Sequence, residues 1–209
     1  GRGRVVAIGP AGERGVRFAT LSNDGRHAGR GGLGAVMGSK NLKALVVRGD
    51  RPTGVADPAR VRRLAAGLRE RAAGAATAKY RELGTAANVA AFARVGALPT
   101  HNFRYGQHPA AANMGQEVYR RMFDKGVDGC WIGCTVACSH GIKDFVPLTG
   151  PCQGQRVFVD GPEYETIAGC GSNLGIFDPF AVTEMNFYCD TYGIDTISFA
   201  NSVAFAMEC

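Results

Sequence analysis

The sequence predicts an α+β protein in which a small β-rich part, residues 1–50, precedes a mostly helical part, residues 51–209. Short apolar, β-branched runs separated by glycine-rich turns mark the first part. After it, apolar residues recur at helical spacing. Two Asp-Pro pairs, which are typical of helix starts, introduce such segments. The change in character near residue 50 is the predicted domain boundary.

In the first part, Arg4–Ile8 and Val16–Leu21 are predicted strands that pair as a hairpin-like unit around a Gly9-Pro10 turn. The polar, glycine-rich stretch Ser22–Gly34 is a predicted loop. Leu42–Val47 is the third predicted strand.

In the second part, Gly49–Ala56 forms the boundary, and Asp57 with Pro58 starts the first helix. The polar stretch Gly96–Gln116 is too long for an ordinary connection, and loops of that length are usually functional or mobile. Further helices are expected at three places: Thr85–Val95, the segment from Asp178-Pro179 to about Tyr192, and the segment that Asp195 caps.

The chain has 209 residues, 45% hydrophobic and 20% charged, which is enough apolar material for a folded core. Its apolar runs are too short to span a bilayer and no secretory leader opens it, so we expect a cytoplasmic protein without membrane association. It does not begin with Met, and the helix after Asp195 runs to the last residue without a cap. We therefore expect a fragment of a longer protein.

The formal net charge of +6 is uneven: residues 1–105 carry 19 Lys or Arg and 6 Asp or Glu, whereas residues 106–209 carry 5 and 12. A basic half could attract nucleic acid, an acidic partner or a phosphorylated cofactor. However, its cations are scattered and few aromatic residues are interleaved with them. We therefore expect no nucleic-acid binding, and solvated helix faces explain most of these cations.

Seven cysteines are many for a chain without an export signal, where reduced thiols are the default. Three of them, Cys130, Cys134 and Cys138, lie within nine residues and can converge on one metal centre, either zinc or an iron–sulfur cluster. Zinc would need His140 as a closely spaced fourth ligand. The alternative is a buried helix face, which the neighbouring glycines disfavour. Four others are expected in the core, although any could be a distant fourth ligand: Cys152, Cys170, Cys189 and Cys209.

Gly29–Gly34 matches the dinucleotide pattern G-x-G-x-x-G, but no predicted strand precedes it, as that fingerprint requires. Its glycines, together with Arg26, Arg30 and Lys40, can present backbone N–H groups and cations to a phosphate-bearing ligand. The alternative is a simple glycine-rich turn.

Another candidate site lies between the last two predicted helices. Gly193 ends the first helix and Asp195 caps the second, so the N–H groups of the second helix face the junction. Asp190 and Asp195 could hydrogen-bond a polar heterocycle there, although capping alone explains every residue of the junction.

With these segments in order, the chain resembles the aldehyde ferredoxin oxidoreductase family of tungsten- or molybdenum-pterin enzymes. The resemblance spans nearly the whole chain and rests on four motifs in the family's order: Ala28–Ala44, the three clustered cysteines, Gly161–Thr166, and Asp190 with Gly193, Ile194 and Asp195. It implies that residues 1–50 end a pterin-cradling β domain. Residues 51–209 would be much of a helical second domain that carries the iron–sulfur cysteines.

The resemblance also implies how the cofactors bind. Asp190, Ile194 and Asp195 would hold one pterin of a tungsten (or molybdenum) bis-pterin, whose phosphates a Mg²⁺ ion could bridge. The glycine-rich loop would contact the phosphate side of the pterins through Ala28, Gly29, Arg30, Gly31 and Gly32. The clustered cysteines would bind a [4Fe-4S] cluster whose fourth ligand lies beyond residue 209: Cys130, Cys134 and Cys138. Glu165, or else Glu163, would be the proton-transfer carboxylate near the metal.

The implied function is oxidation of an aldehyde to a carboxylate, with electrons leaving through the cluster to ferredoxin or another electron-transfer protein. Three residues separate the first two clustered cysteines, a spacing associated with more divergent family members. One alternative is therefore a family member with a different substrate, such as an aromatic thioester that is reduced. The other is a non-catalytic iron–sulfur or zinc module that binds a partner. A homo-oligomer is compatible with each, and the fragment is not expected to be active alone.

Overall fold

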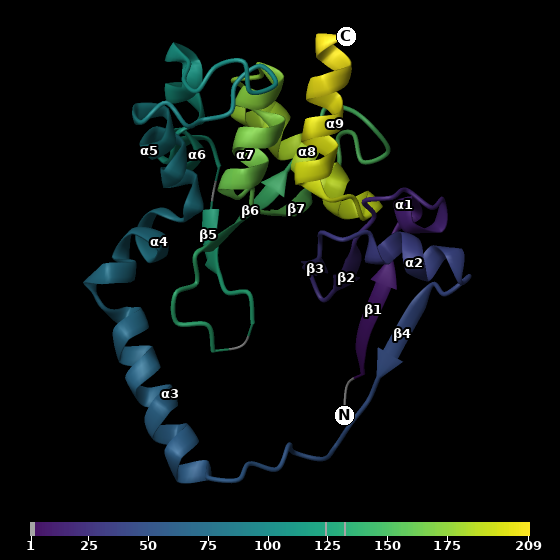
Figure 1. The fold of residues 1–209 in the computed structure, drawn as a ribbon, viewed down its shortest axis with the longest axis vertical. Coiled ribbons are helices and arrows are strands. Elements are labelled where there is room, and N and C mark those ends of the chain that lie inside the picture. The colour runs from purple at the N-terminus through teal and green to yellow at the C-terminus, as the bar shows by residue number, and fades with distance from the viewer. Residues whose placement is uncertain (1–2, 124, 132) are drawn as a thin grey trace.

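The computed structural model describes residues 3–123, 125–131 and 133–209. Within them, the first part is an antiparallel sheet with the strand order β3-β2-β1-β4 (Figure 1). Helices α1 (Pro10–Glu13) and α2 (Leu33–Ser39) pack against each other beside it. The four strands are β1 (Arg4–Ile8), β2 (Leu21–Asn23), β3 (Arg26–Ala28) and β4 (Ala44–Val47).

The predicted strand Val16–Leu21 is wrong, because a distant segment takes its backbone hydrogen bonds. The Thr20 N–H donates to the Gly193 carbonyl over 2.9 Å, and the Phe18 carbonyl accepts from the Asp195 N–H over 3.0 Å. β1 pairs instead with Leu21–Asn23. The predicted Gly9-Pro10 turn is the start of α1, with the proline in its first turn.

The predicted loop Ser22–Gly34 is also wrong in part, since it contains the β2–β3 hairpin and the beginning of α2. Asp24 and Gly25 form the hairpin turn with φ values of 48° and 77°. Two-residue hairpin turns favour such left-handed backbones, which makes Asp-Gly a strong hairpin signal. The hairpin pairs Ser22 with His27 across the two strands.

Three helices of the second part begin at the predicted Asp caps, whereas the helices Ala78–Leu83, Gln116–Met122 and Tyr164–Cys170 were not predicted. Asp57, Asp178 and Asp195 each accept hydrogen bonds from backbone N–H groups in the first turn of the helix that follows. The α-helices are α3 (Pro58–Ala73), α4 (Ala78–Leu83), α5 (Asn88–Arg94), α6 (Gln116–Met122), α7 (Tyr164–Cys170), α8 (Pro179–Tyr192) and α9 (Thr196–Glu208). Short 3₁₀ turns are η1 (Ala75–Thr77), η2 (Thr85–Ala87), η3 (Pro109–Met114) and η4 (Ser172–Leu174).

The second part also contains a small antiparallel sheet of β5 (Lys125–Asp128), β6 (Ser139–Phe145) and β7 (Val157–Asp160). The sequence analysis did not predict it. Its central strand β6 begins with Ser139 and His140, polar side chains that are nevertheless buried. The alternation of apolar and polar residues that reveals a strand is therefore missing there.

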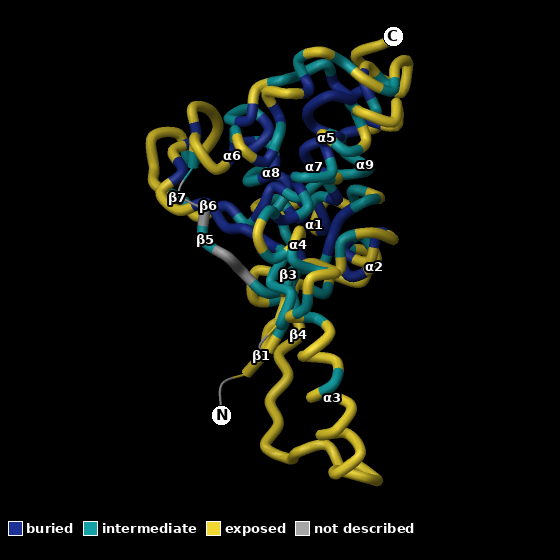
Figure 2. The backbone as a smooth tube through the Cα atoms, turned by 90° about the vertical axis from the view of Figure 1, so that its left-hand side faces the viewer, coloured by how far each residue is buried: buried dark blue, intermediate teal, exposed yellow. Residues whose placement is uncertain are grey.

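Helices α5, α7, α8 and α9 surround the main core, which includes Val89, Leu98, Ile167 and Val182. Burying each such side chain contributes about 1.5–3 kcal/mol. This packing fixes the junction between α8 and α9. In contrast, α3 has no buried residue and projects away from the body (Figures 1 and 2). Among the helices of the described residues, none is both long and apolar enough to cross a membrane.

Candidate functional site

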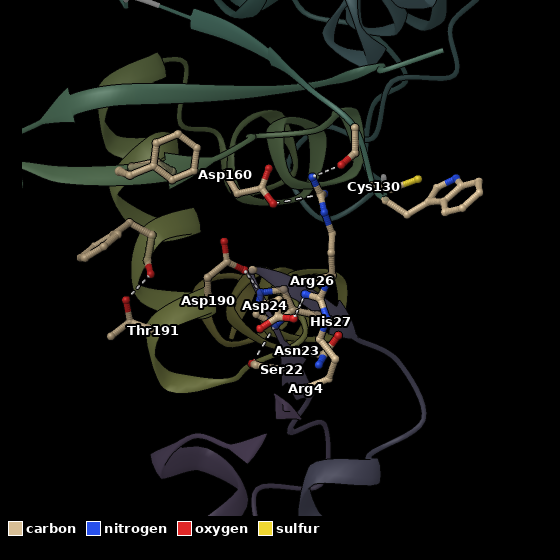
Figure 3. A pocket seen from close by; sticks show the side chains of 16 residues that line it. Arg4, Ser22, Asn23, Asp24, Arg26, His27, Cys130, Asp160, Asp190 and Thr191 are labelled. Carbon is tan, nitrogen blue, oxygen red and sulfur yellow. Dashed lines mark hydrogen bonds and ion pairs between the residues drawn. The ribbon is translucent and has the colours of Figure 1, made fainter. Parts of the chain in front are cut away.

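A pocket of about 790 Å³ lies where the β2–β3 hairpin faces β7, α8 and the loop after β5 (Figure 3). The loop after β5, residues 129–138, carries the three clustered cysteines and is called the cysteine loop here. Both parts of the chain supply charged side chains to the pocket: Arg4, Asp24, Arg26, His27, Asp160 and Asp190. The pocket therefore exists only because the N-terminal sheet docks on the helical part.

Close backbone contact makes this docking specific. A Cβ atom on Gly9 would lie 2.4 Å from the Tyr192 carbonyl oxygen, so only glycine fits at the start of α1. Ala19 forms an isolated antiparallel bridge with Ile194. The Ile194 side chain, a predicted pterin-binding residue, lines a separate apolar pocket beside α8 and α9.

Arg26 of β3 connects the hairpin to both the second sheet and the cysteine loop. Its Nη1 atom is 3.2 Å from Asp160 Oδ2, and its Nη2 donates to the Gly129 carbonyl over 3.4 Å. The other Asp160 oxygen accepts from Ser139 Oγ over 3.0 Å. Arg26 thus holds the residue next to Cys130 at the rim of the pocket.

Asp190, near the end of α8, faces the hairpin. Its Oδ1 is 3.5 Å from His27 Nε2, and its Oδ2 accepts from the Asn186 amide over 3.3 Å. Burial raises the pKa of Asp190 to about 7, and the Asp160 carboxylate adds to this, while Arg26 and Asn186 act against it. Burial lowers the pKa of His27, Asp160 opposes that change, and Arg26 adds to it. Asp190 thus changes protonation near neutral pH.

The glycine-rich segment Gly29–Gly34 has two glycines that the fold requires, Gly32 and Gly34, and two that leave space. Gly32 has φ 71°, and a Cβ there would be 2.3 Å from the Arg17 carbonyl oxygen. Cβ atoms on Gly29 and Gly31 would meet nothing within 4 Å. The loop therefore presents open backbone before α2, as a phosphate-contacting loop needs.

Arg30 joins this loop to the α8–α9 junction. Its Nε is 3.3 Å from Asp195 Oδ2, and 66% of the Arg30 side chain is exposed against 6% for Asp195. Asp195 also caps α9 through the N–H groups of Ile197 and Ser198. The structure thus brings Arg30 and Asp195 together, while Asp190 lies on the pocket side of the same junction.

The cysteine loop places Cys130 and Cys134 near each other, and Cys138 is close enough for both thiols to affect its pKa. Cys130 is exposed, and Cys134 and Cys138 are half-buried. The Cys134 sulfur accepts from the Ala137 N–H over 3.4 Å, which lowers the pKa of its thiol; the Cys130 thiol acts in the same direction. Burial raises the pKa of Cys138, with smaller contributions from Glu163 and the other two thiols. Only Cys130 of the three lines the pocket.

The other cysteines differ among themselves. Cys170 and Cys189 are buried, as expected for core residues, and burial raises the pKa of Cys170 to about 12. Cys209 is exposed, so the expectation that it lies in the core is wrong, and Cys152 is half-buried. Cys209 has no neighbouring element to cover it, because α9 extends beyond the core at that end (Figure 1).

The two candidate carboxylates lie at the start of α7, outside the lining of the pocket. Glu163 is half-buried and accepts a short hydrogen bond from Thr85 Oγ1, whose oxygen also accepts from the Tyr164 N–H over 3.0 Å. Glu165 is exposed in the first turn of the helix.

The sequence does not mark His27 or Asp160 as site residues. Asp160 is the last residue of β7 and His27 is isolated among polar residues, so neither belongs to a motif. The one available signal is position, since His27 directly precedes the glycine-rich loop and Asp160 directly precedes Gly161–Thr166.

The donor groups fit the cofactors that the resemblance implies. The Arg26 and Arg30 guanidiniums and the open faces of Gly29 and Gly31 suit phosphate, and the Asp190 carboxylate suits N–H donors of a heterocycle. A thiol that already accepts a backbone N–H suits an iron–sulfur ligand, because hydrogen bonds to sulfur tune such clusters. Across the described residues, no three His, Cys, Asp or Glu side chains are grouped closely enough to hold a single metal ion.

The β2–β3 hairpin, the cysteine loop and the end of α8 meet at one pocket of this α+β chain. Comparison with models of known protein families identifies the family of the chain. Residues 1–49 match the model for the N-terminal domain of aldehyde ferredoxin oxidoreductase, and residues 63–209 match the model for its domains 2 and 3. The chain belongs to the aldehyde ferredoxin oxidoreductase family of oxidoreductases.

Curated relatives agree. The tungsten-containing aldehyde ferredoxin oxidoreductase of Pyrococcus horikoshii is 41% identical over 98% of this chain, and that of Thermococcus kodakarensis is 39% identical. The aliphatic sulfonate oxidoreductase, WOR-like subunit, of Pyrococcus furiosus is 33% identical over 98% of the chain. The chain spans about a third of the length of these relatives (33% for the first two and 32% for the third).

A solved structure, the active site complex BamBC of benzoyl coenzyme A reductase with 1,5-dienoyl-CoA, shares the fold with a TM-score of 0.65. The match covers 99% of this chain and 32% of that one, at 23% sequence identity. At this identity, the likeness concerns the fold alone.

Proposed function

We propose that this chain contributes the pterin-cradling and cluster-binding regions of a tungsten- or molybdenum-pterin oxidoreductase that oxidises an aldehyde to a carboxylate. Electrons would leave through a [4Fe-4S] cluster to ferredoxin or another electron-transfer protein. The observation that carries the proposal is the convergence of the β2–β3 hairpin, the cysteine loop and Asp190 on one pocket. Because the chain spans a third of its relatives, the proposal concerns the enzyme to which the chain contributes.

The residues have distinct tasks in this proposal. The cluster is held by Cys130, Cys134 and Cys138, and the pterin phosphates, with any bridging Mg²⁺, lie at the loop from Ala28 to Gly32. Asp190, Ile194 and Asp195 hold one pterin. When bound, the tungsten or molybdenum centre and the cluster supply two-electron chemistry and electron transfer, while the chain supplies position and charge.

Proton transfer is assigned to a carboxylate at the start of α7. Glu165 is exposed and can reach groups outside this chain, whereas Glu163 is engaged by Thr85 and lies near Cys138. We therefore propose Glu165 as the proton-transfer group and Glu163 as the second candidate. In the protein that carries this chain, Glu165→Gln should lower kcat strongly and leave the pterin content unchanged, whereas Glu163→Gln should not.

Two proposals concern organisation. Residues 1–50 and 51–209 are proposed as parts of separate domains, which the gap between the two family matches supports. The enzyme is proposed to be cytoplasmic and to act with a small electron carrier, without nucleic acid or membrane.

Elemental analysis of the protein purified without oxygen tests the proposal first. Tungsten or molybdenum with about four irons per chain, the content of one cubane cluster, supports it. Cys134→Ser should lower the bound iron, whereas Cys209→Ser, at the opposite end of the molecule, should not. Iron or zinc without either heavy metal would instead favour the non-catalytic partner-binding module.

A second candidate within the family is action on a different substrate. The relative named as an aliphatic sulfonate oxidoreductase subunit favours it, because members this similar carry names for other substrates. A panel of aldehydes, sulfonates and aromatic thioesters, assayed with a viologen acceptor or donor, separates the two. Turnover of simple aldehydes above all others supports the first candidate.

A further inference from the structure

His27 stands between two polar groups on the wall of the pocket (Figure 3). Its Nδ1 is 3.1 Å from Ser22 Oγ, and its Nε2 is 3.5 Å from Asp190 Oδ1. Ser22 and His27 are cross-strand partners in the β2–β3 hairpin, so the sheet register fixes their distance. Asp190 belongs to α8, and the contact therefore crosses from one part of the chain to the other.

The neighbouring groups determine which ring nitrogen of His27 carries the proton. If the Ser22 hydroxyl donates to Nδ1, the neutral imidazole carries its proton on Nε2, facing Asp190. The Asn186 amide already donates to the other Asp190 oxygen. The carboxylate is then held at both oxygens, and each oxygen keeps a lone pair for an N–H donor in the pocket.

We propose that His27 is a positioning residue which, backed by Ser22, orients Asp190 and favours its ionised form for hydrogen bonding to the N–H groups of a heterocycle in this pocket. The inference rests on the proposed function, in which that heterocycle is a pterin. It assigns a role to His27 that none of the four motifs includes.

The charges around the pair set the direction of the pH effect. Asp160 of β7 disfavours ionisation of Asp190, and Arg26 of β3 favours it. Cys189 lies beside Asp190 on α8 with a pKa that burial raises, so its thiol stays neutral. Arg4 and Asp24 also line the pocket and pair with each other. An N–H donor on His27 Nε2, 3.5 Å from Asp190 Oδ1, favours the ionised carboxylate, so we expect its removal to disfavour ionisation of Asp190.

The test uses the cofactor-loaded protein that carries this chain. Tungsten and the pterin released by acid oxidation are measured per chain after gel filtration at a series of pH values. In His27→Ala, the pH below which the protein loses its cofactor (the acid limb) should rise by about one unit. This corresponds to a tenfold lower ratio of ionised to protonated Asp190 at a given pH. His27→Gln, whose side-chain amide can replace the Nε2–H donor, should return this pH most of the way to the wild-type value. Ser39→Ala, a serine of α2 outside the pocket, is the matched control.

The other outcomes are equally decisive. An unchanged acid limb in His27→Ala overturns the inference, as does an equal loss of cofactor by the Ala and Gln variants at every pH, which would indicate a purely structural role. If His27→Ala does not fold, Ser22→Ala decides: a smaller upward shift supports the inference, and no shift overturns it. Wild-type protein that contains no pterin would instead overturn the proposed function.

Discussion

Gly29 and Gly32 stand three residues apart in the same loop, yet they serve different purposes. At Gly32 the left-handed backbone and the nearby Arg17 carbonyl leave no room for a side chain. At Gly29 neither restriction applies, because a Cβ atom added there would meet no heavy atom within 4 Å. Free space at Gly29 matters for a ligand, whereas the glycine at Gly32 matters for folding.

A pair of substitutions separates these purposes. Gly32→Ala should lower the free energy of unfolding by about 1–3 kcal/mol, since the new Cβ strains the backbone and meets Arg17. Gly29→Ala should change it by less than about 0.5 kcal/mol. Urea denaturation of both variants measures the difference. Equal destabilisation would show that the loop geometry described here is wrong.

Asp190 makes stability depend on pH in a direction unusual for a carboxylate. Its pKa is raised from 3.8 to about 7 in the folded chain, so the folded state binds a proton there that the unfolded state releases. The free energy of unfolding must then fall as pH rises from about 4 to 7, and the penalty is complete above pH 7.

Asp190→Asn removes this penalty. Relative to the wild type, the variant should gain roughly 4 kcal/mol between pH 4 and pH 8 in the cofactor-free protein. Denaturation midpoints at several pH values measure the gain. Parallel pH profiles for the two proteins would contradict the raised pKa.

At the scale of the elements, α3 and α8 have the same cap and opposite surroundings. Asp57 accepts from the Arg60 N–H over 2.8 Å, and Asp178 accepts from the Phe180 N–H over 2.9 Å. Helix α3 buries no residue, whereas α8 packs in the core. Local interactions therefore determine the stability of α3, and tertiary contacts determine that of α8.

The two caps should accordingly fail in different ways. Asp57→Ala and Asp178→Ala should each cost about 1 kcal/mol. In the first variant the loss appears as faster hydrogen exchange confined to α3. In the second it appears as lower global stability without separate opening of α8. Exchange measured by mass spectrometry distinguishes the patterns, and slow exchange of α3 in the Asp57 variant would contradict its independence.

At the scale of the whole molecule, the site depends on how two parts dock. The segment before β2 hydrogen-bonds to the α8–α9 junction, and Gly9 lies against Tyr192 without space for a methyl group. The salt bridges Arg26–Asp160 and Arg30–Asp195 cross the same boundary. The docked arrangement places cations of the basic first part beside carboxylates of the second part.

Gly9→Ala should separate docking from folding. The added Cβ cannot coexist with the Tyr192 carbonyl, so the two parts should move apart while each keeps its own secondary structure. Proteolysis within residues 49–57 should accelerate several-fold and bound cofactor should fall. Gly49→Ala, with open space around it, is the control. Unchanged proteolysis in Gly9→Ala would show that the boundary tolerates the methyl group.

The sequence by itself determined the starts of α3, α8 and α9, because an Asp cap and helical spacing act within one turn. It also determined the family, because the motifs that identify it are local in the sequence. Only the tertiary structure decided the conformation of Val16–Leu21, because Phe18 and Thr20 hydrogen-bond to residues more than 170 positions away. It likewise decided the polar, buried start of β6 and the meeting of His27 with Asp190. Those features depend on contacts between distant segments, and no local pattern of residues encodes such contacts.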